Sequence, residues 1–395
     1  MKVYLDNGAT TKVDPQVVKA MLPYYSDKYG NASSLHSFGR EASKALEESR
    51  AIIAKAINAE PEEIFFTSGG TESDNFAIKK IAHSNREKGN HIITSKIEHP
   101  AVLNSCKFLE SKGFKVTYLA VDKEGFIDLK QLEKSITPQT ILVSIMHANN
   151  EIGTIQDIEK IGAVCKKHKV YFHTDAVQSF TKVPIDVKKM NIDLASFSAH
   201  KLHGPKGIGA LYIRKGTNIQ PMMHGGSQER KMRAGTENVA SAAGFAKAVS
   251  LVNRKELAQI QKLRDYLIKK VLSGIPNSKL NGSKTKRLAN NANIAFKYVE
   301  GEAMLIRMDL AGIAVSTGSA CSSKSLQPSH VLLAIGMDPA EAHGTLRFTL
   351  SKFTTKKEAD YAVGKLEKII KDLRSISPLR KGVEYEIRDL PAHEH

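Results

Sequence analysis

The residues most able to do chemistry in this chain of 395 residues surround one lysine. The mostly apolar run 192–197 precedes Lys201, and the Gly/Pro-rich stretch 204–209 follows it. A lysine just after a buried strand can be removed from water, which lowers an ammonium pKa and makes the amine nucleophilic. The pattern therefore predicts an amine that can form a Schiff base with a carbonyl cofactor.

Polar residues that suit a cofactor also follow four other predicted strands. The strands are 64–67, 91–95, 141–146 and 170–174, and the residues are Gly70 and Thr71, His99, Asn150, and Asp175 with Gln178. In open α/β sheets, ligands bind beyond the carboxyl ends of the strands. The glycine-rich stretch 67–71 leads into a helix, whose first N–H groups favour a phosphate, although it lacks the ending of a P-loop. The sequence therefore predicts one cofactor site at this sheet edge.

Predicted strands and helices alternate along the first two thirds of the chain. Besides the strands above, we expect strands at 115–119, 194–198 and 210–213, and helices at 71–82, 102–112, 129–135 and 158–167. Such alternation favours a mostly parallel α/β sheet covered by helices on both faces.

A smaller domain is predicted after one long helical run, 238–272. Its strands are expected at 293–299, 313–316 and 346–350, and its helices at 302–310 and 357–373. We expect the first residues of the chain to pack onto it. The predicted division is therefore a large cofactor-binding domain, 14–258, and a small domain made of 1–13 and 259–395.

The overall composition is that of an ordinary globular protein, with 41% apolar and 25% charged residues. The net charge of +17 comes from lysines scattered over amphipathic segments, which indicates a solvated cationic surface rather than a dedicated nucleic-acid site. Binding of tRNA as a secondary role stays open. No apolar run approaches the ~20 residues of a membrane helix, and the polar start does not resemble a signal peptide. We therefore expect a cytoplasmic protein with no membrane partner.

Three widely spaced cysteines argue against a disulfide framework and against a metal site. Cys106 and Cys165 lie on apolar helical stripes, which favours buried thiols. Cys321 lies among small polar residues, 319–328, which predicts a mobile loop. A thiol there can attack a substrate sulfur and carry it outward, while a buried structural thiol is the alternative.

Several segments together resemble the class V aminotransferase family of fold-type I pyridoxal-phosphate (PLP) enzymes, and more narrowly the NifS/IscS-type cysteine desulfurases. The segments are Tyr4–Thr11, Gly69–Ser73, Asn149–Gly153, Met232–Thr236 and Ser316–Cys321. The resemblance runs from Tyr4 to Leu379, with Ala32 in place of the proline that is commoner in the family. It implies a large domain with a mostly parallel sheet flanked by helices, plus a smaller α+β domain.

The resemblance also assigns roles toward PLP. It implies that Lys201 holds the cofactor and moves protons, that Asp175 pairs with the ring nitrogen, and that Gln178 donates to the phenolic oxygen. His99 is implied to stack on the ring and to take part in proton transfer.

Further residues are implied to bind the phosphate and the substrate. The phosphate residues are Gly70, Thr71, Ser198 and His200, together with Thr236 acting on the neighbouring subunit, so a homodimer is expected. Asn150, also a cofactor residue, and Arg347 are implied to hold the substrate carboxylate, since a guanidinium binds a carboxylate in bidentate fashion.

The activity implied is conversion of L-cysteine to alanine with formation of a persulfide on Cys321, helped by His99 or by His330. The sulfur is then expected to pass to an iron–sulfur scaffold protein of the IscU/NifU type, with tRNA-thiolation proteins as further acceptors. One alternative is a selenocysteine lyase or another class V lyase or aminotransferase, against which Cys321 argues. A non-catalytic sulfur-scaffold protein on the same fold is the other, and the intact lysine and its partners argue against it.

Overall fold

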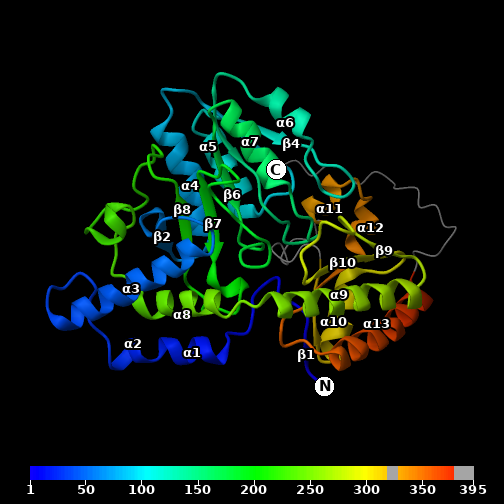
Figure 1. Ribbon diagram of the computed structural model, residues 1–395. Coiled ribbons are helices and arrows are strands. Elements are labelled where there is room, and N and C mark those ends of the chain that lie inside the picture. The colour runs from blue at the N-terminus through cyan, green and yellow to red at the C-terminus, as the bar shows by residue number, and fades with distance from the viewer. Residues whose placement is uncertain (318–327, 378–395) are drawn as a thin grey trace, which may run out of the picture.

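The computed structural model describes residues 1–317 and 328–377, and a seven-stranded sheet lies at its centre (Figure 1). The strand order is β2 (Ile64–Thr67), β8 (Gly209–Ile213), β7 (Leu194–Ser198), β6 (Tyr171–Asp175), β5 (Thr140–Ser144), β3 (His91–Ser95) and β4 (Lys115–Leu119). Six of these strands run in one direction, and β8 runs opposite to them. The predicted mostly parallel α/β sheet is confirmed.

Helices cover both faces of this sheet because successive strand side chains point to opposite sides. Phe65 and Phe66 of β2 therefore belong to different apolar clusters. One cluster lies under α4 (Gly70–Ser84) and α5 (Pro100–Glu110), and the other lies under α3 (Ser37–Lys55), α7 (Ile158–Lys167) and α8 (Val239–Ser250). Among the described residues, no helix is long and apolar enough to cross a membrane.

A second, antiparallel sheet gathers the later part of the chain in the order β12 (Ser316–Thr317), β13 (Thr345–Thr349), β10 (Asn291–Phe296) and β9 (Ser278–Leu280). The core beside it contains Leu267 of α9 (Arg254–Gly274), Met304 of α10 (Gly301–Leu310) and Leu366 of α13 (Lys356–Ile376). As predicted, the first residues pack here, because β1 (Val3–Tyr4) pairs with β11 (Ile313–Ala314).

The predicted single helical run 238–272 is wrong, because two helices, α8 and α9, occupy it. The chain leaves the helical conformation at Asn253, whose side chain accepts a hydrogen bond from Lys255 N at 2.8 Å and starts α9 as an N-cap. Since α9 runs across residues 258 and 259, the predicted domain division stays a prediction.

Several short elements complete the described chain. They are α1 (Pro15–Met21), α2 (Pro23–Ser26), α6 (Leu129–Ser135), α11 (His330–Ala334), α12 (Pro339–His343) and the 3₁₀ turns Pro61–Glu63, Ala199–Lys201 and Gln228–Lys231.

A buried ion pair ties α3 to the turn Gln228–Lys231. Arg50 donates to both carboxylate oxygens of Glu229, at 2.7 and 2.9 Å, and Phe66 N donates to the same carboxylate at 2.8 Å. Glu229, Arg230 and Lys231 all have positive φ values, 42°, 55° and 67°. Residues other than glycine avoid this region, so the ion pair holds a strained turn in place.

We expect Arg50→Met to lower the free energy of unfolding by about 3–5 kcal/mol, because Glu229 is then left buried without its partner. Urea denaturation measures the loss. Lys44→Met on the same helix is the control, since Lys44 and Glu48 form an exposed pair at 3.9 Å and should change stability by less than about 0.5 kcal/mol. Equal losses in the two variants would contradict a special role for the buried pair.

Candidate active site

A cavity of about 290 Å³ opens at the carboxyl ends of β6 and β7. Ten of the twelve predicted site residues line it, namely Gly70, Thr71, His99, Asn150, Asp175, Gln178, Ser198, His200, Lys201 and Arg347. The five sheet segments that the sequence analysis singled out therefore do meet at one place. Gly8, Ala9, Asp74, Met146 and Val177 line the cavity as well, and the sequence analysis gave them no role.

Lys201 lies in the 3₁₀ turn after β7 and reaches the N-terminal segment of the chain. Its Nζ donates to the carbonyl oxygens of Gly8 at 2.6 Å and Ala9 at 2.7 Å. Gln178 Nε2 donates to the same Gly8 oxygen at 3.0 Å. The Gly8 carbonyl thus orients two side chains, Lys201 and Gln178, that follow strands β7 and β6 of the large sheet.

The start of α4 forms a cradle of backbone N–H groups beside Ser198 and His200. Its N-cap is Gly69, and no side chain caps it, so its first N–H groups are open to a ligand. A Cβ at Gly70 would lie 2.6 Å from Val177 Cγ2, so the close approach of the two segments requires glycine. This arrangement, partial positive charge at a helix start, suits a phosphate group.

His200 adds a neutral imidazole to this cradle. Its Nδ1 lies 3.1 Å from Thr10 Oγ1. Burial lowers the pKa of His200 to about 4, and the nearby charge of Lys201 acts in the same direction. A neutral imidazole can donate one hydrogen bond to an anion without carrying a charge of its own.

Asp175, at the end of β6, places a buried carboxyl group at the floor of the cavity. Its Oδ1 accepts a hydrogen bond from Val177 N at 2.9 Å. Burial raises the pKa of Asp175, while His99 and Lys201 act in the opposite direction. A protonated ring nitrogen bound beside it would supply the charge that favours the carboxylate.

Asp74 is a second buried acid at the cavity, and sequence reasoning missed it. Its Oδ1 lies 3.7 Å from His173 Nε2, a separation that would suit an ion pair. However, burial raises the pKa of Asp74 well above its usual range and lowers that of His173 to about 3, so burial opposes the charged form of both groups. Asp74 follows Gly70 by one helical turn, and this spacing could have indicated that it faces the same site.

His99 is the N-cap of α5, and its Nδ1 accepts a hydrogen bond from Ala101 N at 3.1 Å. A neutral imidazole in this arrangement carries its hydrogen on Nε2. Burial lowers the pKa of His99, whereas the charge of Asp175 raises it. The half-buried ring therefore presents a proton donor to the cavity.

Arg347 enters the cavity from β13 of the smaller sheet. Its guanidinium donates to Asn150 O and to Asp6 Oδ1, both at 2.9 Å. Its Nε is buried and has no hydrogen-bond partner among the described residues. A rigidly held guanidinium with donor capacity left is well suited to a ligand carboxylate.

Comparison with known proteins identifies the family. The class-V aminotransferase model matches residues 3–362. The chain belongs to the class-V aminotransferase family. It is 54% identical over 383 residues to "Cysteine desulfurase IscS" of Dictyoglomus turgidum, covering 96% of this chain and 97% of that protein. It is 53% identical to the protein of the same name from Methanosarcina thermophila, covering 95% of this chain and 94% of that protein.

Solved structures agree with this class-V assignment. A "NIFS-LIKE PROTEIN" superimposes with a TM-score of 0.89 at 41% identity, covering 94% of this chain and all of that chain. The structure titled "SspA in complex with cysteine" gives a TM-score of 0.81 at 41% identity, covering 90% of this chain and all of that chain.

Enzymes of the class-V family use PLP, and the cavity fits that group. A lysine, a buried acid and an open helix start are the three features that a carbonyl, a pyridine nitrogen and a phosphate require. All three lie in one cavity.

Two predicted residues are not in this cavity. Thr236 is exposed and lines a separate cavity of about 190 Å³ with Ser68 and Arg233. Cys321 lies outside the described residues. The first described helix after it, α11, is capped by Ser329, whose hydroxyl donates to Glu151 Oε2 at 2.5 Å. Cys106 and Cys165 are buried free thiols, as predicted.

Glu98, the residue before His99, is buried at the ends of β3 and β5. Its Oε1 accepts from Ser95 Oγ at 2.6 Å and from Met146 N at 3.0 Å, and its backbone oxygen lies 3.0 Å from His330 Nε2. Burial raises the pKa of Glu98 from 4.5 to about 8 in spite of these bonds. The segment that carries His99 therefore rests on a carboxyl group that is neutral at pH 7.

We expect Glu98→Gln to gain thermal stability relative to the parent chain as the pH rises from about 5 to about 9. An unfolded Glu98 ionises first, so its raised pKa makes the parent lose stability between pH 4.5 and about 8, and glutamine removes that loss. Thermal unfolding across this pH range measures the effect. Glu87→Gln, on an exposed turn, is the control; a parallel trend in both variants would contradict the assignment.

Proposed function

We propose that this chain is a PLP-dependent L-cysteine desulfurase that forms alanine and transfers the sulfur to Cys321. The observation that carries the proposal is the meeting of Lys201, Asp175 and Arg347 in one cavity, since these groups suit the aldehyde and ring of PLP and the carboxylate of an amino acid. The cysteine desulfurases among its relatives and the cysteine complex of a similar structure support the same substrate.

The cofactor residues divide the work along the cavity. Asp175 would pair with the ring nitrogen, Gln178 would donate to the phenolic oxygen, and His99 would lie against the ring. The phosphate would be held by Gly70, Thr71, Ser198 and His200. When bound, PLP supplies an electron sink for charge that develops at the substrate Cα.

Substrate binding is assigned to Arg347 and Asn150. Because Asp6 and the Asn150 carbonyl already hold two of its nitrogens, the Arg347 guanidinium offers a carboxylate a fixed direction of approach. Lys201, in the same cavity, would take the proton from the Cα of a substrate held in this way and so act as a general base. The hydrogen on His99 Nε2 is the one that this arrangement makes available for proton donation during the reaction.

Sulfur transfer is assigned to Cys321. Its thiolate attacks the substrate Sγ and forms an S–S bond, while the Sγ–Cβ bond breaks. The electron pair of the broken bond stays on Cβ, which takes a proton, and Lys201 returns to Cα the proton that it removed, which gives alanine. The products are alanine and a persulfide on Cys321, so no external oxidant or reductant is required.

We expect Cys321→Ser to abolish persulfide formation and to keep the visible absorption of bound PLP, because only the sulfur acceptor is removed. Mass spectrometry of the chain after cysteine addition measures the persulfide. Cys106→Ala is the control, since burial raises the pKa of that thiol to about 12 and makes it a poor nucleophile. Unchanged sulfur transfer in the Cys321→Ser variant would overturn the assignment.

The proposal also includes the proteins that accept the sulfur and the cellular compartment. We assign the persulfide sulfur to an iron–sulfur scaffold protein of the IscU/NifU type, and also to tRNA-thiolation proteins, within the cytoplasm. The two buried free thiols support a reducing compartment, where disulfides are rare.

A homodimer completes the proposed site. Large apolar side chains are exposed on and between α2 and α3, with Leu35 91% and Tyr29 66% exposed. Thr236, which the family resemblance assigns to the phosphate, is exposed and does not line the active-site cavity of its own chain. Both features are accounted for if a second copy covers this face and receives Thr236 in its own site.

Co-expression of Lys201→Ala chains with Thr236→Ala chains should give mixed dimers with one complete site and restored desulfurase activity. Two affinity tags allow the mixed dimer to be isolated and assayed. The control pairs the Thr236→Ala chain with a chain that carries both substitutions, which leaves no complete site. Inactive mixed dimers would contradict the shared site, and a monomer in sedimentation would contradict the dimer.

A further inference from the structure

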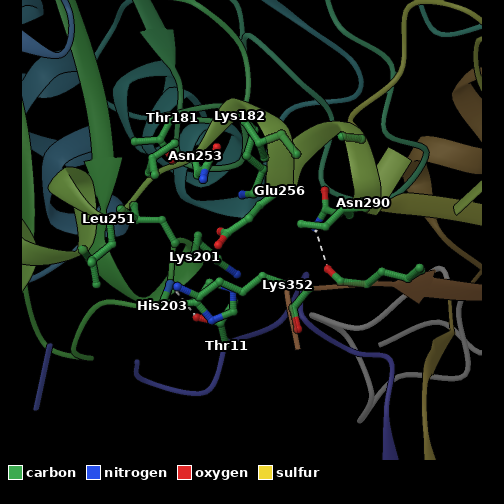
Figure 2. A pocket seen from close by; sticks show the side chains of 18 residues that line it. Thr11, Thr181, Lys182, Lys201, His203, Leu251, Asn253, Glu256, Asn290 and Lys352 are labelled. Atoms are coloured by element: carbon green, nitrogen blue, oxygen red, sulfur yellow. Dashed lines mark hydrogen bonds between the residues drawn. The ribbon is translucent and has the colours of Figure 1, made fainter. Parts of the chain in front are cut away.

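A second, smaller cavity lies against Lys201, beside the one that would receive PLP. It has a volume of about 60 Å³ and is mostly apolar, with Leu202, Leu257 and Ile260 in its walls. Figure 2 shows Lys182, Lys201 and Glu256 among the side chains that line it. Asn253 and Glu256 of α9 border it, and Lys182 reaches it from the segment after β6. Lys201 is thus in contact with two cavities, and the mechanism uses only one of them.

Lys182 is linked to Lys201 by a short chain of hydrogen bonds. Lys182 Nζ donates to the backbone oxygen of Gln178, one turn earlier, at 2.9 Å. The Gln178 side chain and Lys201 Nζ both donate to the Gly8 oxygen, at 3.0 and 2.6 Å. The position of Lys182 is therefore coupled to Gln178, which is assigned to the phenolic oxygen of PLP, and to Lys201, which is assigned to its aldehyde.

We propose that Lys182 is a positioning residue for Lys201, whose ammonium group fixes Gln178 and weakens proton binding at the Lys201 nitrogen through the apolar cavity. The inference rests on the proposed PLP function. A positive charge close to a second nitrogen in a poorly hydrated space disfavours its protonated form, and a less protonated nitrogen is the better nucleophile and base.

The charged groups around Lys182 determine how strongly its charge acts on the Lys201 nitrogen. Burial, and to a smaller extent the charge of Lys201, lower the pKa of Lys182 to about 7. His200 and His203, in and after the same turn as Lys201, are neutral because burial lowers each pKa to about 4. Lys352 is paired with Asp14 at 2.6 Å. Among the described residues that line the cavity, Glu256 is the acidic one. Lys182 is therefore the cation that can change charge near neutral pH.

The test is a pH titration of the visible absorption of PLP in the resting, cofactor-loaded protein, without cysteine. The absorption reports protonation of the Lys201 nitrogen. Lys182→Met should raise the pKa of that nitrogen by about one unit, because the positive charge of Lys182, which opposes protonation, is lost. Lys182→Arg keeps the charge and should stay at or below the parent value. Lys189→Met, which removes an exposed lysine paired with Glu159 at 3.0 Å, is the control and should not shift it.

The outcomes separate this inference from the proposed function. A parent chain without a visible PLP band would overturn the proposed function and this inference with it. If the PLP absorption of the parent chain titrates with pH and the Lys182→Met variant titrates at the same pH, only the role of Lys182 is overturned. If Lys182→Met does not fold, Lys182→Gln provides the neutral side chain, and an unshifted titration of that variant overturns the role equally.

Discussion

The carbonyl group of Gly8 is the contact on which the whole site depends. Its oxygen accepts hydrogen bonds from Lys201 and Gln178, which follow strands β7 and β6 of the large sheet. The N–H of the same residue donates to Thr349 Oγ1 at 2.6 Å, on the strand that carries Arg347. One peptide segment from the start of the chain therefore sets the spacing between Lys201 and Gln178, the residues proposed to bind the cofactor, and Arg347, the residue proposed to bind the substrate. Gly8 and Thr349 are 341 positions apart in the sequence, and Gly8 and Lys201 are 193 positions apart.

Burial is the second physical theme of the site. It makes the histidines neutral at positions 173 and 200 and raises the pKa values of Asp74, Glu98 and Asp175. A site of this kind contains few permanent charges before a ligand enters. A charged cofactor and a zwitterionic substrate then provide the charges to which these groups respond.

Much of the fold could be predicted because buried parallel strands are nearly continuous apolar runs. The predicted bounds of β2, β3, β4 and β7 agree with the structure residue for residue. The break before α9 was missed because an asparagine cap also fits the polar side of a continuous amphipathic helix. The long helix α3 was not predicted, although its apolar residues repeat with helical spacing and His36 caps it.

Most of the site could also be predicted, since polar residues after buried strands must gather at one sheet edge. Asp74 and Lys182 were missed for a shared reason. Each lies one turn after an assigned residue, Gly70 or Gln178, and single motifs do not show which neighbours face the same space. The role proposed for Thr236 requires a second chain, and pairing between chains leaves no periodic pattern in a sequence.

The reversed direction of β8 affects how the two segments that would bind the cofactor are spaced. Because β8 is antiparallel to both neighbours, Gly209 pairs with Thr67 on one side and with Ser198 on the other. A methyl group at Gly209 would meet Phe197 O at 2.5 Å and Gly69 Cα at 2.7 Å. The span between the phosphate cradle and the lysine turn is therefore set by backbone touching backbone. The separation of these two segments therefore depends on the absence of a side chain at Gly209.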